Sequence, residues 1–324
     1  MGKRRVRCLL ANQVRPEDIR LVDLRSDRRD ETKTKYNVEG FPSLPEGLDW
    51  NPEAVFVSVP GAFHIAACLE AARAGKHLFC EVPLSINLDG VRELAELVSQ
   101  NHLVLAPGCQ PPFHPLYRQL KQWLATPDFG KALMVVEIFG QYLPDWHPYE
   151  DYRTFYAASE KMGGCNLDVI AQQATVLCWL LEDQIQEVFC RGHHLSTLEV
   201  DGSDCLQILA KTIQGTALTQ QYDLVQRAGY HSMRFISETT TLEYNPSEGN
   251  VRRYRAETKA WETATKPEGF QYEQCYIDET ASFLECLDGK NEWHVRLETA
   301  IGVIRFLQSV LQSATDGRLV RIEP

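Results

Sequence analysis

The chain has 324 residues, of which 44% are hydrophobic, and it carries a formal net charge of -11. This length exceeds one typical domain and indicates two, and the negative charge argues against a nucleic-acid partner, because phosphates are bound by basic faces. The sequence has no run of about 18 uncharged apolar residues, and its ten cysteines form no Cys-x-x-Cys pair, so we expect a cytoplasmic protein with no membrane segment, disulfide framework or metal site.

The first segment resembles a dinucleotide-binding unit that starts late. Residues 3–12 predict a helix, and residues 19–24 predict a strand with the acid Asp23 near its end. Such a unit has a strand and a G-x-G-x-x-G turn before this helix, and an acid about twenty residues later that binds the ribose. Gly2 matches the third glycine and Asp23 matches the acid, but the first strand and the first two glycines are absent. Either the start at Met1 is truncated relative to the protein's relatives, or the protein does not bind a dinucleotide in the usual way.

The basic residues of this helix have two interpretations. Lys3, Arg4, Arg5 and Arg7 form a local cluster, which is either the solvated start of a helix or a set of phosphate contacts. The sequence leaves both open.

Residues 53–84 form the clearest unit of the chain. Residues 54–59 predict a strand covered on both faces, residues 63–74 predict a helix, and residues 77–80 predict the next strand. Together they make a right-handed βαβ unit. Because ligands of open parallel sheets bind beyond the carboxyl ends of the strands, the segments 58–60 and 81–83 should line one crevice.

These residues carry a resemblance to a known family. A strand ending in Ser58-Val59-Pro60, a following Phe63-His64, and a second strand ending in Cys80-Glu81-Val82-Pro83-Leu84 resemble the Gfo/Idh/MocA family of NAD(P)-dependent oxidoreductases. The family's motif is Glu-Lys-Pro, so Val82 stands at the position of its catalytic lysine. The resemblance implies NAD or NADP as cofactor, and we expect weak binding, with a dissociation constant above about 1 mM, because the glycine cradle is incomplete. The nucleotide-binding positions would be Gly2, Asp23, Ser58, Pro60, His64 and Glu81.

We place the domain boundary near residue 110, where prolines and glycines interrupt the predicted helices and strands. Residues 1–110 predict a Rossmann-like α/β domain with a doubly wound parallel sheet that lacks its first strand. Residues 111–324 predict an α+β domain for substrate and oligomer contacts, built on a large, mostly antiparallel sheet. The resemblance implies that the outer face of this sheet forms a homo-oligomer. The predicted strands of the sheet include residues 186–194, 204–212, 216–223, 232–237 and 240–244, and residues 273–287 and 298–315 predict helices.

The second domain contains the box Gly163-Gly164-Cys165-Asn166-Leu167-Asp168, which opens a long apolar helix. It resembles the family's box in which an Asp and, four residues later, a His reach the nicotinamide. Residues four apart share a helix face, so Asp168 and Gln172 should point into the same space. Neither Gln172 nor Val82 can carry the proton that hydride transfer from an alcohol releases, and the remaining Asp168 is either a weak base or only the N-terminal residue of its helix.

A loop before this box is rich in aromatic and acidic residues. Trp146, His147 and Tyr152 lie in residues 142–153 and could stack on and hydrogen-bond a sugar ring. Alternatively, the segment is a rigid loop over the sheet. His147 or Tyr152 could also serve as a substitute proton carrier.

The sequence therefore predicts an NAD(P)-linked dehydrogenase or reductase of a sugar, sugar nucleotide or cyclitol, impaired or inactive as written. Two alternatives stay open: a non-catalytic relative that keeps a ligand pocket, and a subunit that pairs with an active partner.

Overall fold

A computed structural model describes residues 1–148 and 150–323. The chain divides into two compact units, one formed by Met1–Phe113 with Gln271–Leu297 and the other by His114–Phe270 with Glu298–Pro324. The boundary near residue 110 stays a prediction, and the structure adds that the segment after residue 270 returns to the first unit. Within the described residues, no helix combines the length and apolar character needed to cross a bilayer.

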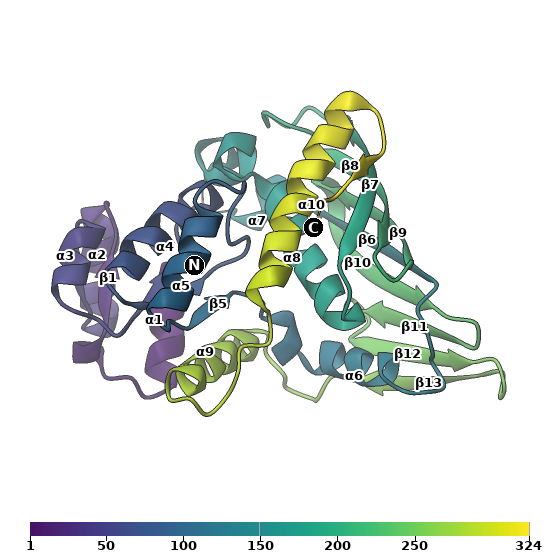
Figure 1. Ribbon diagram of the computed structural model, residues 1–324, viewed down its shortest axis with the longest axis horizontal. Helices are drawn as coiled ribbons and strands as arrows, with labels where there is room; N and C mark the ends of the chain where they lie inside the picture. Colours follow the sequence, from purple (N-terminus) through teal and green to yellow (C-terminus); the bar gives the residue numbers. More distant parts are fainter. Residues whose placement is uncertain (149, 324) are drawn as a thin grey trace. The chain divides into compact units, whose positions relative to one another are not determined.

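The first unit is Rossmann-like, as predicted, with two short parallel sheets and helices around them (Figure 1). One sheet pairs β1 with β2, and the other has the order β3-β4-β5. No described strand joins the two sheets. The elements are α1 (Gly2–Ala11), β1 (Arg20–Val22), α2 (Ser26–Tyr36), β2 (Glu39–Phe41), α3 (Leu44–Asp49), β3 (Ala54–Val57), α4 (His64–Arg73), β4 (His77–Cys80), α5 (Val91–Gln100), β5 (Leu105–Pro107) and α9 (Glu273–Leu287).

Each sheet of the first unit has its own apolar core. Val6 of α1 packs with Ile19, Leu21 and Val38 around the β1–β2 sheet. Around the second sheet, Phe79 packs with Ala106 of β5 and Phe283 of α9, and the Phe79 and Phe283 rings meet edge to face at 5.6 Å. The Phe283 ring is fully buried in this core, so α9 belongs to the first unit.

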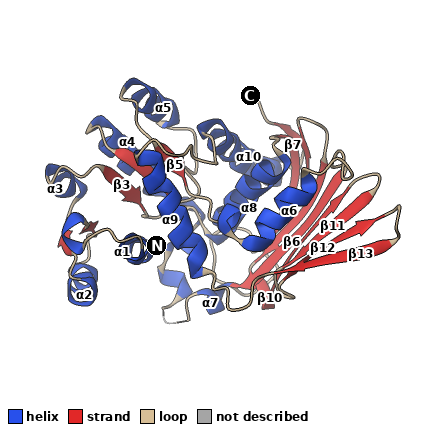
Figure 2. Ribbon diagram, turned by 90° about the horizontal axis from the view of Figure 1, so that it is seen from below, coloured by secondary structure: helices blue, strands red, loops and turns tan. Residues whose placement is uncertain are grey.

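The second unit is built on a nine-stranded sheet with the order β13-β12-β11-β10-β6-β9-β8-β7-β14. All neighbouring strands are antiparallel except β6 and β9, so the predicted mostly antiparallel sheet is confirmed. Helices α6, α8 and α10 lie on one side of it (Figure 2). The elements are α6 (Pro115–Leu124), β6 (Met134–Tyr142), α7 (Leu143–Trp146), α8 (Cys165–Leu181), β7 (Ile185–His193), β8 (Cys205–Thr212), β9 (Ala217–Asp223), β10 (Val225–Ile236), β11 (Thr240–Asn245), β12 (Asn250–Arg255), β13 (Ala260–Thr265), α10 (Leu297–Asp316) and β14 (Val320–Arg321).

Buried and exposed side chains alternate along the strands of this sheet, so the sheet has one packed face and one face open to solvent. Along β8, Leu206 and Ile208 are buried, whereas Leu209 is 55% exposed. Successive side chains of a strand point to opposite faces, so one face packs on the helices and the other meets solvent. On the open face, Leu209 lies opposite Phe189 of β7.

Candidate functional site

Glu81, at the carboxyl end of β4, is held by a buried ion pair with Arg5. The Nε atom of Arg5 lies 2.6 Å from Glu81 Oε1, and its Nη2 atom lies 2.7 Å from Glu279 Oε2. The Arg5 side chain is 3% exposed and that of Glu279 is fully buried. The Arg5 guanidinium also lies 4.2 Å from the centre of the Phe79 ring. One arginine therefore ties α1, β4 and α9 together.

Two carboxylates share this single arginine, and their pKa values shift in opposite directions. Burial opposes ionisation of Glu81, but the charge and hydrogen bonds of Arg5 outweigh it and hold the pKa of Glu81 below its ordinary value. For Glu279, burial dominates and raises the pKa, although Arg5 acts in the opposite direction. The Oε1 atom of Glu279 also accepts the Cys109 amide over 2.7 Å. The pKa values of the two carboxyl groups are therefore shifted in opposite directions around one cation.

The ends of β3 and β4 are linked by His64. Its ring nitrogens lie 2.6 Å from the Pro83 carbonyl oxygen and 2.7 Å from that of Val59, and burial lowers its pKa. Pro60 caps the short turn that leads into α4, where its carbonyl accepts the Phe63 amide over 2.8 Å. His64 and Pro60 therefore fix the backbone at the carboxyl ends of β3 and β4.

Three further predicted nucleotide-binding positions differ in what they offer a ligand. The hydroxyl oxygen of Ser58 is buried and has no hydrogen-bond partner among the described residues, so a ligand group or water could satisfy it. Asp23 follows β1 and accepts the Arg25 amide over 2.9 Å. Gly2 begins α1, and a Cβ added to it would meet only a Leu21 methyl at 3.8 Å. Asp23 and Ser58 carry polar oxygens at the ends of strands β1 and β3, and Gly2 is not needed for close packing here.

In the second unit, the two glycines of the predicted box set the start of α8. Gly163 and Gly164 have φ values of 108° and 53°, a region that favours glycine. Asp168 lies in the first turn of the helix and accepts a hydrogen bond from the Tyr156 hydroxyl over 3.0 Å. Gln172 follows one turn later and is half-buried. The sequence did not point to Tyr156, although the aromatic run before the glycines was a usable signal.

Aromatic rings of the predicted loop are connected, through ring contacts, to the tyrosine that binds the Asp168 carboxylate. The rings of Trp146 and His147 lie 5.8 Å apart, and the His147 ring meets Phe155 edge to face at 5.2 Å. Phe155 in turn contacts Tyr156 at 5.3 Å. A chain of rings therefore runs from Trp146 to the tyrosine that holds Asp168.

Tyr152 has a different place. It is 8% exposed, and its hydroxyl oxygen accepts the Glu199 amide over 3.1 Å. It joins the loop to the segment around Glu199 and lies outside the chain of rings. Tyr149, within the same predicted loop, lies outside the described residues.

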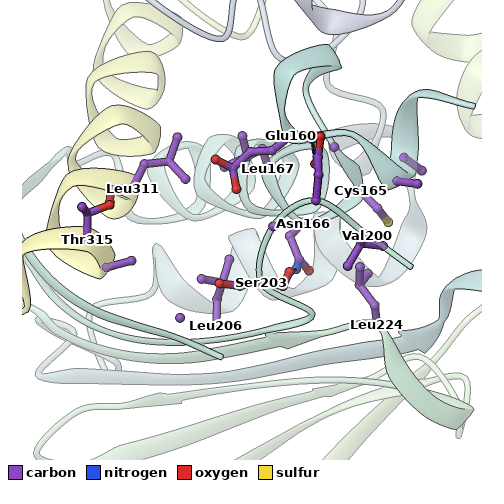
Figure 3. A pocket seen from close by; sticks show the side chains of 17 residues that line it. Glu160, Cys165, Asn166, Leu167, Val200, Ser203, Leu206, Leu224, Leu311 and Thr315 are labelled. Atoms are coloured by element: carbon purple, nitrogen blue, oxygen red, sulfur yellow. Dashed lines mark hydrogen bonds between the residues drawn. The ribbon is translucent and has the colours of Figure 1, made fainter. Parts of the chain in front are cut away.

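A cavity of about 260 Å³ lies beside the first turn of α8 (Figure 3). Leu206 and Leu311 contribute apolar surface, and Glu160 lies at its edge. Burial and the nearby Asp201 carboxylate raise the pKa of Glu160. Asp168 and Gln172 do not line this cavity, so it is separate from the face of α8 on which the predicted site was placed.

Comparison with known proteins decides the family. Residues 1–109 match the family model described as an oxidoreductase family with an NAD-binding Rossmann fold, Gfo/Idh/MocA. The predicted resemblance to the Gfo/Idh/MocA family is confirmed over this part of the chain. Residues 1–109 thus match the NAD-binding part of the family, and the predicted cofactor class, NAD or NADP, is confirmed at the level of the family.

Proteins similar to this chain include cyclitol dehydrogenases. It is 29% identical to a myo-inositol 2-dehydrogenase of Thermotoga maritima over 182 residues, which are 56% of this chain and 52% of that protein. The match thus spans about half the length of that relative. An uncharacterized oxidoreductase of Bacillus subtilis, YrbE, is 23% identical over 312 residues, which cover 94% of this chain and 88% of that protein.

Solved structures confirm the fold over the whole chain. A levoglucosan dehydrogenase in complex with NADH and levoglucosan superposes with a TM-score of 0.87 at 14% identity, covering 100% of this chain and 97% of the other. A UDP-N-acetylglucosamine 3-dehydrogenase from Acidithiobacillus ferrooxidans has a TM-score of 0.80 at 17% identity, covering 98% and 95%. At these identities the likeness concerns the fold alone.

Proposed function

We propose that this protein binds a nicotinamide nucleotide and a sugar, sugar nucleotide or cyclitol, and that its hydride-transfer activity is impaired. The observation that carries the proposal is the hydrogen bond from Tyr156 to Asp168 of α8. It is combined with Val82 and Gln172, which stand at the two positions where the resemblance places proton carriers. The site keeps a carboxylate that can hold a hydroxyl group, but neither replaced residue can take its proton.

Asp23 and Ser58 would hold the nucleotide. An acid after the second strand of such a unit binds the ribose hydroxyls, and the partnerless hydroxyl of Ser58 would complete its hydrogen bonds with the ligand. The cofactor, when bound, supplies the hydride acceptor or donor. Gly2, Pro60 and His64 would shape the surrounding backbone, and Glu81 would act indirectly, since Arg5 already holds it.

Asp168 would accept a hydrogen bond from a substrate hydroxyl, with Tyr156 fixing its orientation. Trp146 and His147 would offer ring faces to the substrate, and Tyr152 would support the loop through its bond to Glu199. A carboxylate is generally a poorer proton acceptor for an alcohol than a histidine or a lysine of lowered pKa. Binding without efficient turnover is the expected result.

A non-catalytic role is the second candidate, and the same two replacements favour it. In that role the chain keeps the ligand pocket or pairs with an active partner subunit. We further propose that the open face of the large sheet, around Phe189 and Leu209, forms a homo-oligomer. We also propose that the protein works in the cytoplasm, in keeping with its ten buried cysteines.

Calorimetry and a turnover assay test the proposal separately. NAD and NADP are titrated into the protein, into Asp23→Ala and into the control Asp18→Ala, whose carboxylate is paired with Arg15 at the surface. We expect Asp23→Ala to weaken nucleotide binding by about tenfold and the control to leave it unchanged. Turnover is followed by nicotinamide absorbance across cyclitols and sugars. Equal nucleotide binding by all three proteins would overturn the assignment of Asp23.

A further inference from the structure

The cavity beside the first turn of α8 lies within the second unit and does not include Asp168 or Gln172. It is bordered by α8, α10, β7 and β8, together with the loops that hold Glu160 and Asp201. Its volume of about 260 Å³ is below the range of roughly 300–1,000 Å³ that holds drug-sized ligands. The cavity therefore suits a smaller molecule.

Helix α8 begins at this cavity without a cap. The N-cap residue Gly164 has no side chain to accept a hydrogen bond from the helix. Among the described residues, no group accepts the backbone amides of Cys165, Asn166 and Leu167. These three residues line the cavity and are only 1%, 8% and 5% exposed. Buried amides at a helix N-terminus are satisfied by water or a ligand, and a negatively charged group is favoured there.

Two side chains that line the cavity carry oxygen atoms without hydrogen-bond donors (Figure 3). Asn166 donates its side-chain nitrogen to the Ser203 carbonyl oxygen, and no group in the described part of the chain donates to its Oδ1 atom. The same holds for the carboxylate of Glu160. Because Asn166 is more than nine-tenths buried, its open oxygen calls for a donor from water or from a ligand.

Glu160 and Asp201 also give the cavity a negative charge. Asp201 accepts hydrogen bonds from the Ser159 hydroxyl over 2.9 Å and from the Glu160 amide, which are both neutral groups. The lining residues include no Lys, Arg or His. Burial and the Asp201 charge raise the pKa of Glu160, as expected for two nearby carboxylates without a cation. A positively charged ligand group would balance this charge.

We propose that this cavity, the α8 pocket, binds a free α-amino acid with an aliphatic side chain. The carboxylate of the amino acid accepts the first-turn amides of α8, and its ammonium group donates to Glu160 and to Asn166 Oδ1. Its side chain packs against the apolar wall formed by Leu206, Leu224 and Leu311. A simple anion would be repelled by two carboxylates, and a simple amine would leave the helix amides without an acceptor. A zwitterion satisfies both, and the proposal does not depend on the proposed function.

Calorimetric titration with related molecules tests the ligand class. L-leucine, L-valine and L-methionine are the zwitterions, 3-methylbutylamine is leucine without its carboxylate, and 4-methylpentanoate is leucine without its ammonium group. We expect at least one of the amino acids to bind with a dissociation constant below about 1 mM, and both leucine analogues to bind at least about tenfold more weakly than L-leucine. Binding of none of the amino acids, or equal binding of L-leucine and either analogue, would overturn the proposal.

Variants of the pocket test where the amino acid binds. Glu160→Gln removes the charge and should weaken amino-acid binding by about tenfold or more, without weakening that of 4-methylpentanoate. Gly202→Ala keeps the charge but places a Cβ atom 2.5 Å from the present position of Glu160 Oε2, so it displaces the carboxylate and should weaken binding too. Glu238→Gln, at an exposed residue between β10 and β11 outside the pocket, is the matched control and should bind as the unmodified protein does.

The outcomes separate this proposal from the proposed function. Amino-acid binding that is unchanged in both Glu160→Gln and Gly202→Ala overturns the α8 pocket. Binding that Asp168→Asn abolishes and Glu160→Gln leaves intact places the amino acid at the proposed substrate site, which also overturns the pocket. Amino-acid binding by a protein that binds neither a nicotinamide nucleotide nor a polyol supports the pocket and counts against the proposed function alone.

Discussion

The Nε atom of Arg5 lies 2.6 Å from Glu81 Oε1, which joins the first helix of the chain to the end of strand β4 across 76 residues of sequence. This contact gives the Glu of the Glu-Val-Pro segment a structural role. Because the ion pair is buried and Glu279 shares the same arginine, loss of Arg5 would leave two carboxylates without a cation.

Arg5→Met should therefore strongly destabilise the first unit. Removing one partner of a buried ion pair costs about 3–5 kcal/mol, and urea unfolding monitored by circular dichroism measures the change. The matched control is Arg15→Met, because Arg15 pairs with Asp18 while 67% exposed, and exposed pairs contribute about 1 kcal/mol or less. Equal losses in the two variants would contradict a buried, stabilising pair.

The Arg5→Met penalty should also depend on pH. Without the cation, burial should raise the pKa of Glu81 above its unfolded value, so the folded state binds protons more readily than the unfolded chain. The deficit relative to the unmodified protein should then be smaller near pH 4 than near pH 7. A deficit that grows on acidification would show that Glu81 is not the group left uncompensated.

The unmodified protein should lose stability between about pH 6.5 and pH 4. Burial lowers the pKa of His294 to about 4, although the Cys109 carbonyl acts in the opposite direction, and burial with nearby Lys266 lowers that of His114 to about 4. Because the unfolded chain takes up these protons first, stability falls as pH drops through this window. For His294 the loss is at most about 3 kcal/mol.

His294→Phe isolates that contribution. The variant should lose less stability than the unmodified protein between pH 7 and pH 4.5. Between pH 7 and pH 8 the free energy of unfolding of both proteins should change little, because the histidine is mostly neutral in the folded and in the unfolded state. Urea unfolding at these pH values gives the comparison. An unchanged acid slope in the variant would exclude His294 as a source of the loss.

The βαβ unit was predictable because its signal is local. The apolar run at residues 54–59 and the turn glycine at residue 75 predict strands and a helix, and the structure has β3 at Ala54–Val57, α4 at His64–Arg73 and β4 at His77–Cys80. Strands β12 and β13 were missed. Along β13 the side chains are mostly exposed, so no apolar face marks it as a strand.

The site was less predictable because its contacts cross long stretches of sequence. Arg5 was grouped with Lys3, Arg4 and Arg7 as solvated or phosphate-binding, but it is buried beside Glu81 and Glu279. The α8 pocket likewise combines Glu160, Asn166 and Leu311 from separate parts of the chain. Local patterns identify residues capable of chemistry, whereas the partner of each one is set by sheet register and helix packing.

Leu209→Glu should dissociate the proposed homo-oligomer. Leu209 is 55% exposed on the open face of the sheet and lies opposite Phe189, so a buried carboxylate at a contact between two copies would be costly. Light scattering should report a lower mass for this variant than for the unmodified protein. Leu195→Glu, at a 66% exposed loop leucine, is the control and should keep the mass. A monomeric unmodified protein would contradict the proposed interface.

The last prediction concerns the two positions that cannot carry a proton. Proton transfer by a positioned group contributes about 10²–10⁴-fold to rate, so Val82 and Gln172 should leave the protein with negligible sugar or cyclitol dehydrogenase activity even when both ligands bind. Val82→Lys combined with Gln172→His should recover part of this factor, whereas each single variant, serving as the control for the pair, should recover less, because groups that act as a unit are non-additive. Adding Asp168→Asn to the double variant should remove the recovered activity, since we propose that the carboxylate held by Tyr156 orients the substrate hydroxyl. Nicotinamide absorbance across a panel of cyclitols and sugars measures turnover. Robust turnover by the unmodified protein would show that another group, such as His147, accepts the proton, and the impaired-enzyme proposal would be wrong.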